Sequence, residues 1–385
     1  MIKYALPVLV LTLLLILQVH NVLSFPVHRG FDIEGHLGYI NYLKTAHALP
    51  KATQGYEMYQ PPLYYFLASL IPSLSAARII NILAYFLIVL AAYWLAKFPG
   101  AMLVAILPIS IYLTPPIGNE FFTAAMVGLT LVYYVKNYRK LTTTKLITLG
   151  ILLGLCILSK LTAFALAIVI FIDLLKNDRR KIFLPLLLMI LVGGWFYVRD
   201  FLLYRNPFVV NTDFPQFAIT HSPAIRTLAY FFNLNGFLKL DLFNAHHYSF
   251  LAGTYFSWFF DGNNVVFPVQ PFSKIGILLI ILSLPIFLVF IYGLVSKFKR
   301  LSRTGFIMMI YLIIIFTAYV FFVFKISNYF ATKSSYIASA IIPFAYFTVI
   351  GMKKFKKYYS VVIIYLFVYS LLIVKAFWIM PQWYK

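Results

Sequence analysis

Long apolar runs, separated by short polar connections, occupy most of the chain. A helix needs about 20 apolar residues to cross a bilayer, and fewer where it packs inside the protein. On this criterion the sequence predicts eleven transmembrane helices, and its fold class is an all-α polytopic membrane protein. The expected ranges are 4–23, 77–96, 100–114, 120–136, 145–159, 161–176, 182–204, 274–296, 304–324, 334–352 and 358–378.

The apolar stretch 63–74 is left out of this set because it is short and is interrupted at Pro72. The basic residues support the omission. They cluster in four connections, at 136–145, 176–181, 297–303 and 353–357. With eleven spans and a cytoplasmic N-terminus, all four connections are cytoplasmic, as the positive-inside rule requires. A further span at 63–74 would move every cluster outside, so we expect a re-entrant or interfacial helix there.

Two long segments, 24–76 and 205–273, fall on the predicted outer side. The first contains apolar positions that recur on one side of a helix, at Ile33, Leu37, Ile40 and Leu43. This pattern predicts an amphipathic helix along the membrane surface. The second segment is rich in aromatic residues, which favours an ordered loop over a disordered one.

Composition agrees with this class and excludes several others. Apolar residues make up 63% of the chain and charged residues 11%, which no soluble domain of this length has. The formal charge of +22 suggests nucleic acid, but basic residues in such a chain set orientation or contact anionic lipids, so we expect no nucleic-acid partner. A single cysteine, Cys156, excludes an internal disulfide and a cysteine metal site.

The scarce acidic residues gather on the predicted outer side, beginning at Asp32. Asp32 and His36 are four residues apart and share one helix face. This spacing allows three alternatives. The Asp32 carboxylate orients the His36 imidazole, the two side chains bind a metal ion together, or they form a solvated surface pair. Glu34 points elsewhere, as a solvated or capping acid.

A second polar group lies in YEMYQPPLYY (56–65), where two prolines predict a helix start. This start places Tyr56, Glu57 and Gln60 close to a helix N-terminus. A helix start favours anions, so the position either binds a phosphate or is simply capped.

Further candidates lie at the ends of predicted spans. Asn119 and Glu120 predict a helix start with an acid in its first turn. Lys160 lies between two apolar runs, where an ammonium needs a partner or a lipid phosphate. Arg199 and Arg205 close the seventh span beside an aspartate. Arginine suits phosphate binding, and the alternative is an interfacial position with a local ion pair.

The chain resembles bacterial and archaeal members of the GT-C glycosyltransferase superfamily. The resemblance is greatest to the branch of protein O-mannosyltransferases and the aminoarabinose transferase of lipid A. It covers roughly residues 1–265. It is carried, in this order, by FDIEGHLGYINYL, YEMYQPPLYYFLASL, TPPIGNEFFTAAM, GILLGLCILSKLTAFAL, GWFYVRDFLLYRNP and GTYFSWFFDGN.

This resemblance implies a membrane enzyme that transfers a sugar from a polyprenyl-phosphate donor to an extracytoplasmic acceptor. Asp32 matches the catalytic base of the family. Glu120 matches a second acid that shapes the site, although related sequences often carry Asp there. Tyr64 and the rest of QPPLYY border the lipid-donor cavity, while Lys160 and Arg199 match basic residues that hold the donor phosphate.

The chain departs from the family near its end, where KSSYIASA (333–340) replaces an Arg-Tyr pair, so no role is assigned to Lys333. We expect residues 1–273 to form the catalytic module and 274–385 to add C-terminal helices without a soluble domain. The expected protein lies in the cell membrane, with its active site outside. It needs no cofactor, inverts the anomeric centre, and acts on a protein, lipid or glycan acceptor.

Three alternatives remain. An O-antigen ligase or polymerase would use Arg226, His221 or His246, which leaves Asp32 unexplained. A transporter or lipid flippase needs ionisable residues near the bilayer midplane and two related halves, and the sequence has neither. A divalent metal, which the resemblance does not favour, would be held by Asp32, Glu34, His36 and Glu120.

Overall fold

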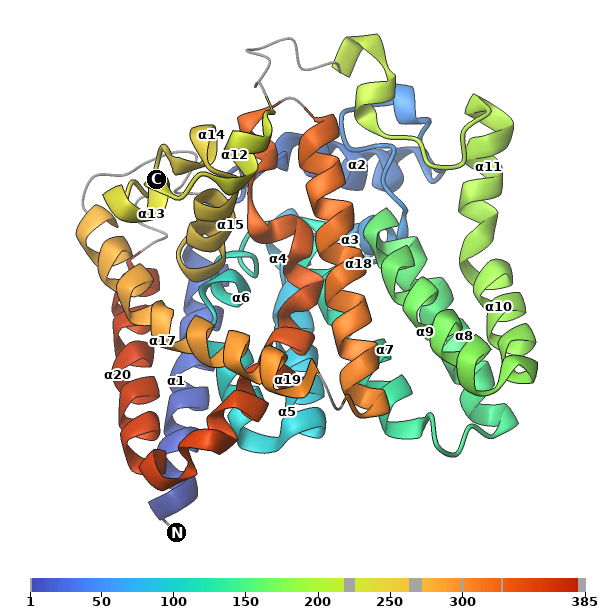
Figure 1. The fold of residues 1–385 in the computed structure, drawn as a ribbon. Coiled ribbons are helices and arrows are strands. Elements are labelled where there is room, and N and C mark those ends of the chain that lie inside the picture. Colours follow the sequence, from blue (N-terminus) through green and yellow to red (C-terminus); the bar gives the residue numbers. More distant parts are fainter. Residues whose placement is uncertain (1, 218–225, 263–271, 299–300, 327, 380–385) are drawn as a thin grey trace.

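The structure, a computed structural model, describes residues 2–217, 226–262, 272–298, 301–326 and 328–379 (Figure 1). Every regular element in these ranges is helical, which confirms the predicted all-α class. The α-helices are α1 (Ile2–Ser24), α2 (Ile33–Ala46), α3 (Leu63–Ser69), α4 (Leu74–Ala77), α5 (Ile79–Ile106), α6 (Pro108–Tyr112), α7 (Asn119–Asn137), α8 (Thr143–Ser159), α9 (Phe164–Asn177), α10 (Phe183–Met189), α11 (Trp195–Tyr204), α12 (Leu228–Phe232), α13 (Asn235–Lys239), α14 (Ala245–Tyr248), α15 (Phe250–Phe259), α17 (Phe272–Phe298), α18 (Arg303–Lys325), α19 (Ile341–Met352) and α20 (Tyr359–Trp378).

Seven segments of the described chain are long and apolar enough to cross a membrane, which confirms a multi-pass membrane protein. They are Leu6–Ser24, Leu74–Ile106, Arg179–Tyr204, Ser273–Phe298, Arg303–Lys325, Ser334–Phe355 and Val361–Trp378. Three more predicted spans coincide with α7, α8 and α9, which have 19, 17 and 14 residues. The number eleven stays a prediction.

Helix α5 reverses direction in its second half. Its backbone leaves the helical region at Ala96 and Lys97, and the Tyr85 hydroxyl donates a 3.2 Å hydrogen bond to the Ala105 carbonyl. Two residues this far apart in sequence would be separated by about 30 Å in a straight helix. The two arms of α5 therefore lie antiparallel, and they coincide with the separate spans predicted on either side of this turn.

The segment between α1 and α5 folds into short helices instead of crossing the membrane. Helix α2 buries the predicted apolar face, Ile33, Leu37, Ile40 and Leu43, which confirms its amphipathic character. Helix α3 has seven residues and a length of about 10 Å, a third of the hydrocarbon thickness. This agrees with the exclusion of 63–74 from the spans.

The two ends of the molecule differ in what they carry (Figure 1). Helices α2 and α12 to α15 lie at one end. The N-terminus lies toward the opposite end of the molecule. The connections from α7 to α8 and from α19 to α20 lie there too, and both contain basic clusters. The predicted outer segment 205–273 is described only in part and contributes α12, α13, α14 and α15.

A buried ion pair joins α9 to α18. The carboxylate of Asp173 accepts hydrogen bonds from Arg303 Nε at 3.0 Å and Nη2 at 2.7 Å. The Tyr134 hydroxyl of α7 donates a third, at 2.5 Å. Asp173 is 1% exposed, so three helices are linked through one desolvated charge.

Candidate active site

Asp32 is the N-cap residue of helix α2, and its backbone is left-handed (φ 53°, ψ 23°). This conformation costs most residues about 1–2 kcal/mol, and aspartate is among the few that tolerate it. The Asp32 side chain makes no capping hydrogen bond and is exposed. At the start of the helix the turn therefore presents a carboxylate that is not used to cap the helix.

One turn further along α2, His36 points into the protein and meets the loop before α3. Its Nδ1 lies 2.9 Å from the Tyr65 hydroxyl and 3.9 Å from Glu57 Oε2. His36 and Glu57 are both 3% exposed. Glu57 lies directly on the backbone of Gly35, where a Cβ would come within 2.7 Å of Glu57 Cγ. Glycine is thus required there for the close approach of loop and helix.

Hydrogen bonds between two side-chain amides, those of Gln60 and Asn119, extend the cluster to α7. Gln60 Nε2 donates hydrogen bonds to Glu57 Oε2 and to the Tyr59 hydroxyl, both at 3.0 Å. Asn119, the first residue of α7, donates from Nδ2 to Gln60 Oε1 at 3.3 Å and to the Ser159 carbonyl at 3.1 Å. These bonds fix the loop before α3 against the start of α7 and the end of α8.

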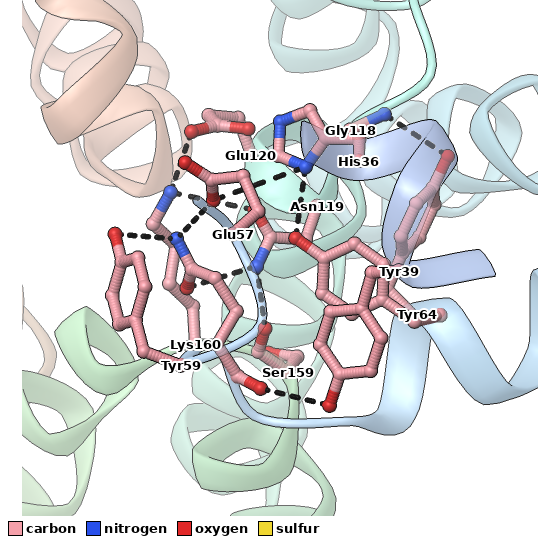
Figure 2. A network of polar contacts seen from close by, with 12 residues as sticks. His36, Tyr39, Glu57, Tyr59, Tyr64, Gly118, Asn119, Glu120, Ser159 and Lys160 are labelled. Carbon is pink, nitrogen blue, oxygen red and sulfur yellow. Dashed lines mark hydrogen bonds and ion pairs between the residues drawn. The ribbon is translucent and has the colours of Figure 1, made fainter. Parts of the chain in front are cut away.

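Lys160 completes the network at the end of α8 (Figure 2). Its Nζ donates to Glu120 Oε1 at 2.5 Å and to Asn119 Oδ1 at 3.4 Å. Lys160 is 8% exposed, so the sequence expectation that its ammonium needs a partner is met by Glu120. Helix α7 thus contributes two adjacent side chains to one buried cation.

Burial sets the charge states of the loop residues. Burial lowers the pKa of His36 against the opposing effect of the Glu120 and Asp32 carboxylates, so the imidazole is neutral at pH 7. Burial raises the pKa of Glu57 well above 4.5, and the charges of Asp32 and Glu120 raise it further. The Glu57 carboxyl therefore favours its protonated form.

Sequence reasoning assigned no role to Lys333, yet the structure brings it to the same site. Lys333 precedes the 3₁₀ segment η8 (Ser334–Ala340) and is 6% exposed. Its Nζ lies 3.3 Å from the centre of the Phe31 ring and 5.4 Å from that of Tyr336. Burial lowers the pKa of Lys333, and Asp32 opposes this more than any other charge. The sequence signal was an isolated lysine directly before an apolar run.

An apolar cavity of about 610 Å³ lies beside η8, between α15, α17, α18 and α19. Ile337 and Ala340 of η8 are part of its lining. Aromatic residues provide half of the remaining wall, including Phe250, Trp258 and Phe344. A cavity of this size and character accepts an apolar chain.

Other predicted site residues lie at the edge of this network or outside it. The Tyr64 hydroxyl accepts a 3.1 Å hydrogen bond from the Gly118 amide at the start of α7. Burial raises the pKa of Tyr56 to about 12, and the Asp32 carboxylate contributes to this rise. Glu34 pairs with His28 at the surface, at 2.9 Å.

The two arginines at the end of α11 do not join the lysines. Arg199 donates from Nη2 to the Pro50 carbonyl at 2.5 Å and from Nη1 to Asp200 Oδ1 at 3.2 Å. It thereby fastens the chain after α2 to α11. Arg205 is exposed at the left-handed C-cap of α11. The phosphate contact of these two residues stays a prediction, and in the structure Arg199 acts as a tether between two segments.

The described residues that an O-antigen ligase would use, Arg226 and His246, both contact Tyr230 and lie apart from this network. His221 lies outside the described residues. Arg226 donates to the Asn328 carbonyl at 2.5 Å and lies over the Tyr230 ring. His246 is 2% exposed, and neither ring nitrogen has a hydrogen-bond partner among the described residues. These two side chains do not form part of the network around Glu57.

No family model and no curated protein sequence matches the chain. Solved structures do. The crystal structure of ArnT from Cupriavidus metallidurans bound to undecaprenyl phosphate matches with a TM-score of 0.59 at 14% sequence identity. The match covers 97% of this chain and 76% of ArnT. The apo structure of the same protein gives a TM-score of 0.58 with the same coverage.

Identity this low establishes likeness of fold and not of activity. The alignment nevertheless runs through nearly the whole chain, including the C-terminal helices that the sequence motifs did not reach. The predicted resemblance is therefore confirmed at the level of structure: the chain has the fold of ArnT, the aminoarabinose transferase of the GT-C superfamily.

Proposed function

We propose that this protein is an integral membrane glycosyltransferase that takes a sugar from a polyprenyl-phosphate donor. One observation carries the proposal: the chain has the fold of a transferase whose crystal structure holds undecaprenyl phosphate. The buried network of acids and lysines at one end of an apolar molecule supports it. A lipid-linked donor requires such a site beside the bilayer.

The reaction is a direct displacement at the anomeric carbon. The acceptor hydroxyl oxygen attacks this carbon and forms the new glycosidic bond, while the bond from the carbon to the phosphate oxygen breaks. The phosphate leaves with the electron pair, and the hydroxyl proton passes to the Asp32 carboxylate. Attack opposite the leaving group inverts the configuration. The Asp32 side chain makes no capping hydrogen bond to its helix, which suits the role of a general base.

The developing negative charge on the phosphate requires a positive partner. The lysines of this site can provide it, because Lys160 and Lys333 are both buried and the Asp32 charge acts directly on Lys333. We assign charge stabilisation to these ammonium groups.

The proposal predicts that Asp32→Asn abolishes sugar transfer. Membranes containing the wild type or the variant at equal amounts are incubated with radiolabelled polyprenyl-phosphate monosaccharides, and label in endogenous acceptors is counted. Loss of a general base lowers the rate about 10²- to 10⁴-fold. The control is Asp178→Asn, which removes an acid that pairs with Lys181 at the surface, and it should transfer like the wild type.

Two outcomes would overturn this assignment. Equal transfer by wild type and Asp32→Asn removes Asp32 from the mechanism. If the wild type transfers sugar from none of the donors, the glycosyltransferase proposal is wrong. That result would favour a transporter or lipid flippase with the same fold.

A further inference from the structure

His36 and Glu120 face each other across Gly118 (Figure 2). A Cβ on Gly118 would lie 3.2 Å from Glu120 Oε2 and 3.4 Å from His36 Nε2. In the described chain, no hydrogen bond or ion pair joins these two side chains. Two hydrogen bonds through a shared oxygen span about 5–6 Å. The space beside Gly118, which we name the Gly118 gap, therefore suits one oxygen atom between the two groups.

The Tyr65 hydroxyl decides which nitrogen of His36 carries the proton. Burial raises the pKa of Tyr65 well above 10, so this hydroxyl keeps its proton. Its one hydrogen-bond partner among the described residues is His36 Nδ1, at 2.9 Å. A buried hydroxyl proton without an acceptor is costly, so Tyr65 donates to Nδ1. Because the imidazole is neutral, its own proton is then on Nε2, at the Gly118 gap.

The Gly118 gap thus has a donor on one side and an acceptor on the other. Lys160 donates to Glu120 Oε1 at 2.5 Å, which leaves Oε2 facing the gap. A hydroxyl group can accept from His36 Nε2 while it donates to Glu120 Oε2. A phosphate would instead be repelled by the carboxylate. The gap therefore favours a neutral hydroxyl over an anion.

The position of the gap suits a sugar. The Glu120 side chain is 24% exposed, so the gap can be reached from outside the network. His36 follows Asp32 by one turn of α2, about 5.4 Å of helix, which is close to the width of a monosaccharide ring. A sugar whose anomeric carbon lies near the Asp32 carboxylate therefore brings one of its ring hydroxyls to the gap.

We propose that His36 Nε2 and Glu120 Oε2 together bind one hydroxyl of the transferred sugar, and that this contact selects the sugar. The inference rests on the proposed function and names a binding role for His36 beside the base Asp32. Tyr65 is a positioning residue, because it fixes the proton of His36 without touching the sugar. A sugar without the matching hydroxyl leaves both polar groups unpaired, which makes a site of this kind selective.

The test measures binding to the purified full chain in detergent, without an acceptor. The probes are undecaprenyl-phosphate glucose, mannose and arabinose, each intact and lacking one ring hydroxyl at a time. We expect the wild type to prefer one intact sugar over a single deoxy analogue by at least about tenfold, because a hydrogen bond to a charged group is lost. If the wild type distinguishes no sugar from its deoxy analogues, the inference is wrong.

Two substitutions of His36 separate sugar binding from a structural role. His36→Asn places an amide near the position of Nδ1 and can keep the contact with Tyr65, but it has no group at the gap. His36→Gln places its amide near the position of Nε2. We expect His36→Gln to retain most of the preference and His36→Asn to lose it. A purely structural role favours His36→Asn, so the reverse order of the two variants would contradict the inference.

Gly118→Ala tests the same gap without removing either side chain. Gly118 has an extended backbone (φ 171°), which alanine also adopts. The new methyl group enters the gap, so we expect the preference for the intact sugar to be lost. The matched control is Gly38→Ala on α2, where a Cβ has no neighbour within 4 Å, and it should bind like the wild type. If His36→Asn does not fold, Gly118→Ala decides, and a preference that it retains would overturn the inference.

Binding without an acceptor also identifies the source of the hydroxyl. A preference for the intact donor under these conditions can come only from the transferred sugar. If the preference depends on His36 only during transfer, and only with acceptors that carry a second hydroxyl, that hydroxyl belongs to the acceptor. This result would overturn the assignment to the transferred sugar.

The two proposals can fail separately. A hydroxyl preference that depends on His36, without transfer from any donor, would contradict the glycosyltransferase and leave a sugar-binding site. Transfer that is lost in Asp32→Asn, with a hydroxyl preference unchanged in His36→Asn and Gly118→Ala, would leave the enzyme and contradict the role of His36.

Discussion

Glu57 is a carboxyl group held where ionisation is unfavourable. Its neighbours are a neutral imidazole, an amide and the backbone of Gly35, while the nearest charges include two carboxylates. A protonated Glu57 is both a donor and an acceptor and can join the amide of Gln60 to groups beyond it. Its neutrality limits the negative charge of the site to Asp32 and Glu120, opposite two lysines.

This arrangement predicts a pH effect on stability. In the unfolded chain Glu57 ionises above pH 4.5, while the folded protein keeps it protonated to higher pH. Above pH 4.5 the wild type therefore loses up to ~1.4 kcal/mol of unfolding free energy per pH unit, until the folded group also ionises. Glu57→Gln, which keeps an acceptor for Gln60, removes this loss.

The measurement is the thermal unfolding midpoint in one detergent at pH 5 and pH 8. The midpoint of Glu57→Gln should fall less than that of the wild type between these values. An equal fall in the two proteins would show that Glu57 is ionised in the folded state.

Local spacing predicted much of the site, because His36 follows Asp32 by one turn and Asn119 and Glu120 open a helix. Long-range partners could not be read in this way. Arg199 finds its acceptor at Pro50, 149 residues away in sequence. Lys333 reaches Phe31 from the far end of the chain. Each contact depends on how the helices pack against one another, which the pattern of apolar residues in the sequence does not predict.

At the scale of helices, the buried pair of Asp173 and Arg303 predicts a large effect on stability. Arg303→Met leaves the carboxylate of Asp173 desolvated, without a cation and with only the neutral donors Tyr134 and Asn177. We expect a loss of about 3–5 kcal/mol, seen as a lower unfolding midpoint. The control is Lys181→Met, which breaks a half-exposed pair with Asp178 and should cost about 1 kcal/mol or less. Similar losses in both variants would mean that α9 and α18 do not depend on this pair.

Apolar length predicted the helices well and their turns less well. The exclusion of 63–74 agrees with the short α3, and the two spans around residue 97 are the two arms of α5. The short helices α12 to α14 were not predicted individually. Each has four or five residues, so neither helical period nor length distinguishes it from a turn.

At the scale of the whole molecule, the separation of the two ends makes orientation testable. Cys156 is the only cysteine and is buried, so Cys156→Ala provides a background for labelling. Lys140→Cys lies in the exposed connection between α7 and α8, and Gln216→Cys is exposed after α11. We expect a membrane-impermeant maleimide to label Gln216→Cys in intact cells and Lys140→Cys only after lysis, because basic connections stay in the cytoplasm.

The opposite labelling pattern would place the N-terminus outside and the polar site in the cytoplasm. It would contradict an extracytoplasmic acceptor while leaving the fold unchanged.

The contact of Lys333 with Phe31 also has a consequence for biosynthesis. Roughly 300 residues separate the two, so at ~5–20 residues per second the ribosome needs on the order of half a minute to supply the second after the first. During this time the nascent chain carries Asp32 and His36 but lacks the lysine that lies beside them in the folded protein. Under the proposed function, catalytic competence therefore arises only when the last helices insert, and incomplete chains remain inert toward the lipid donor.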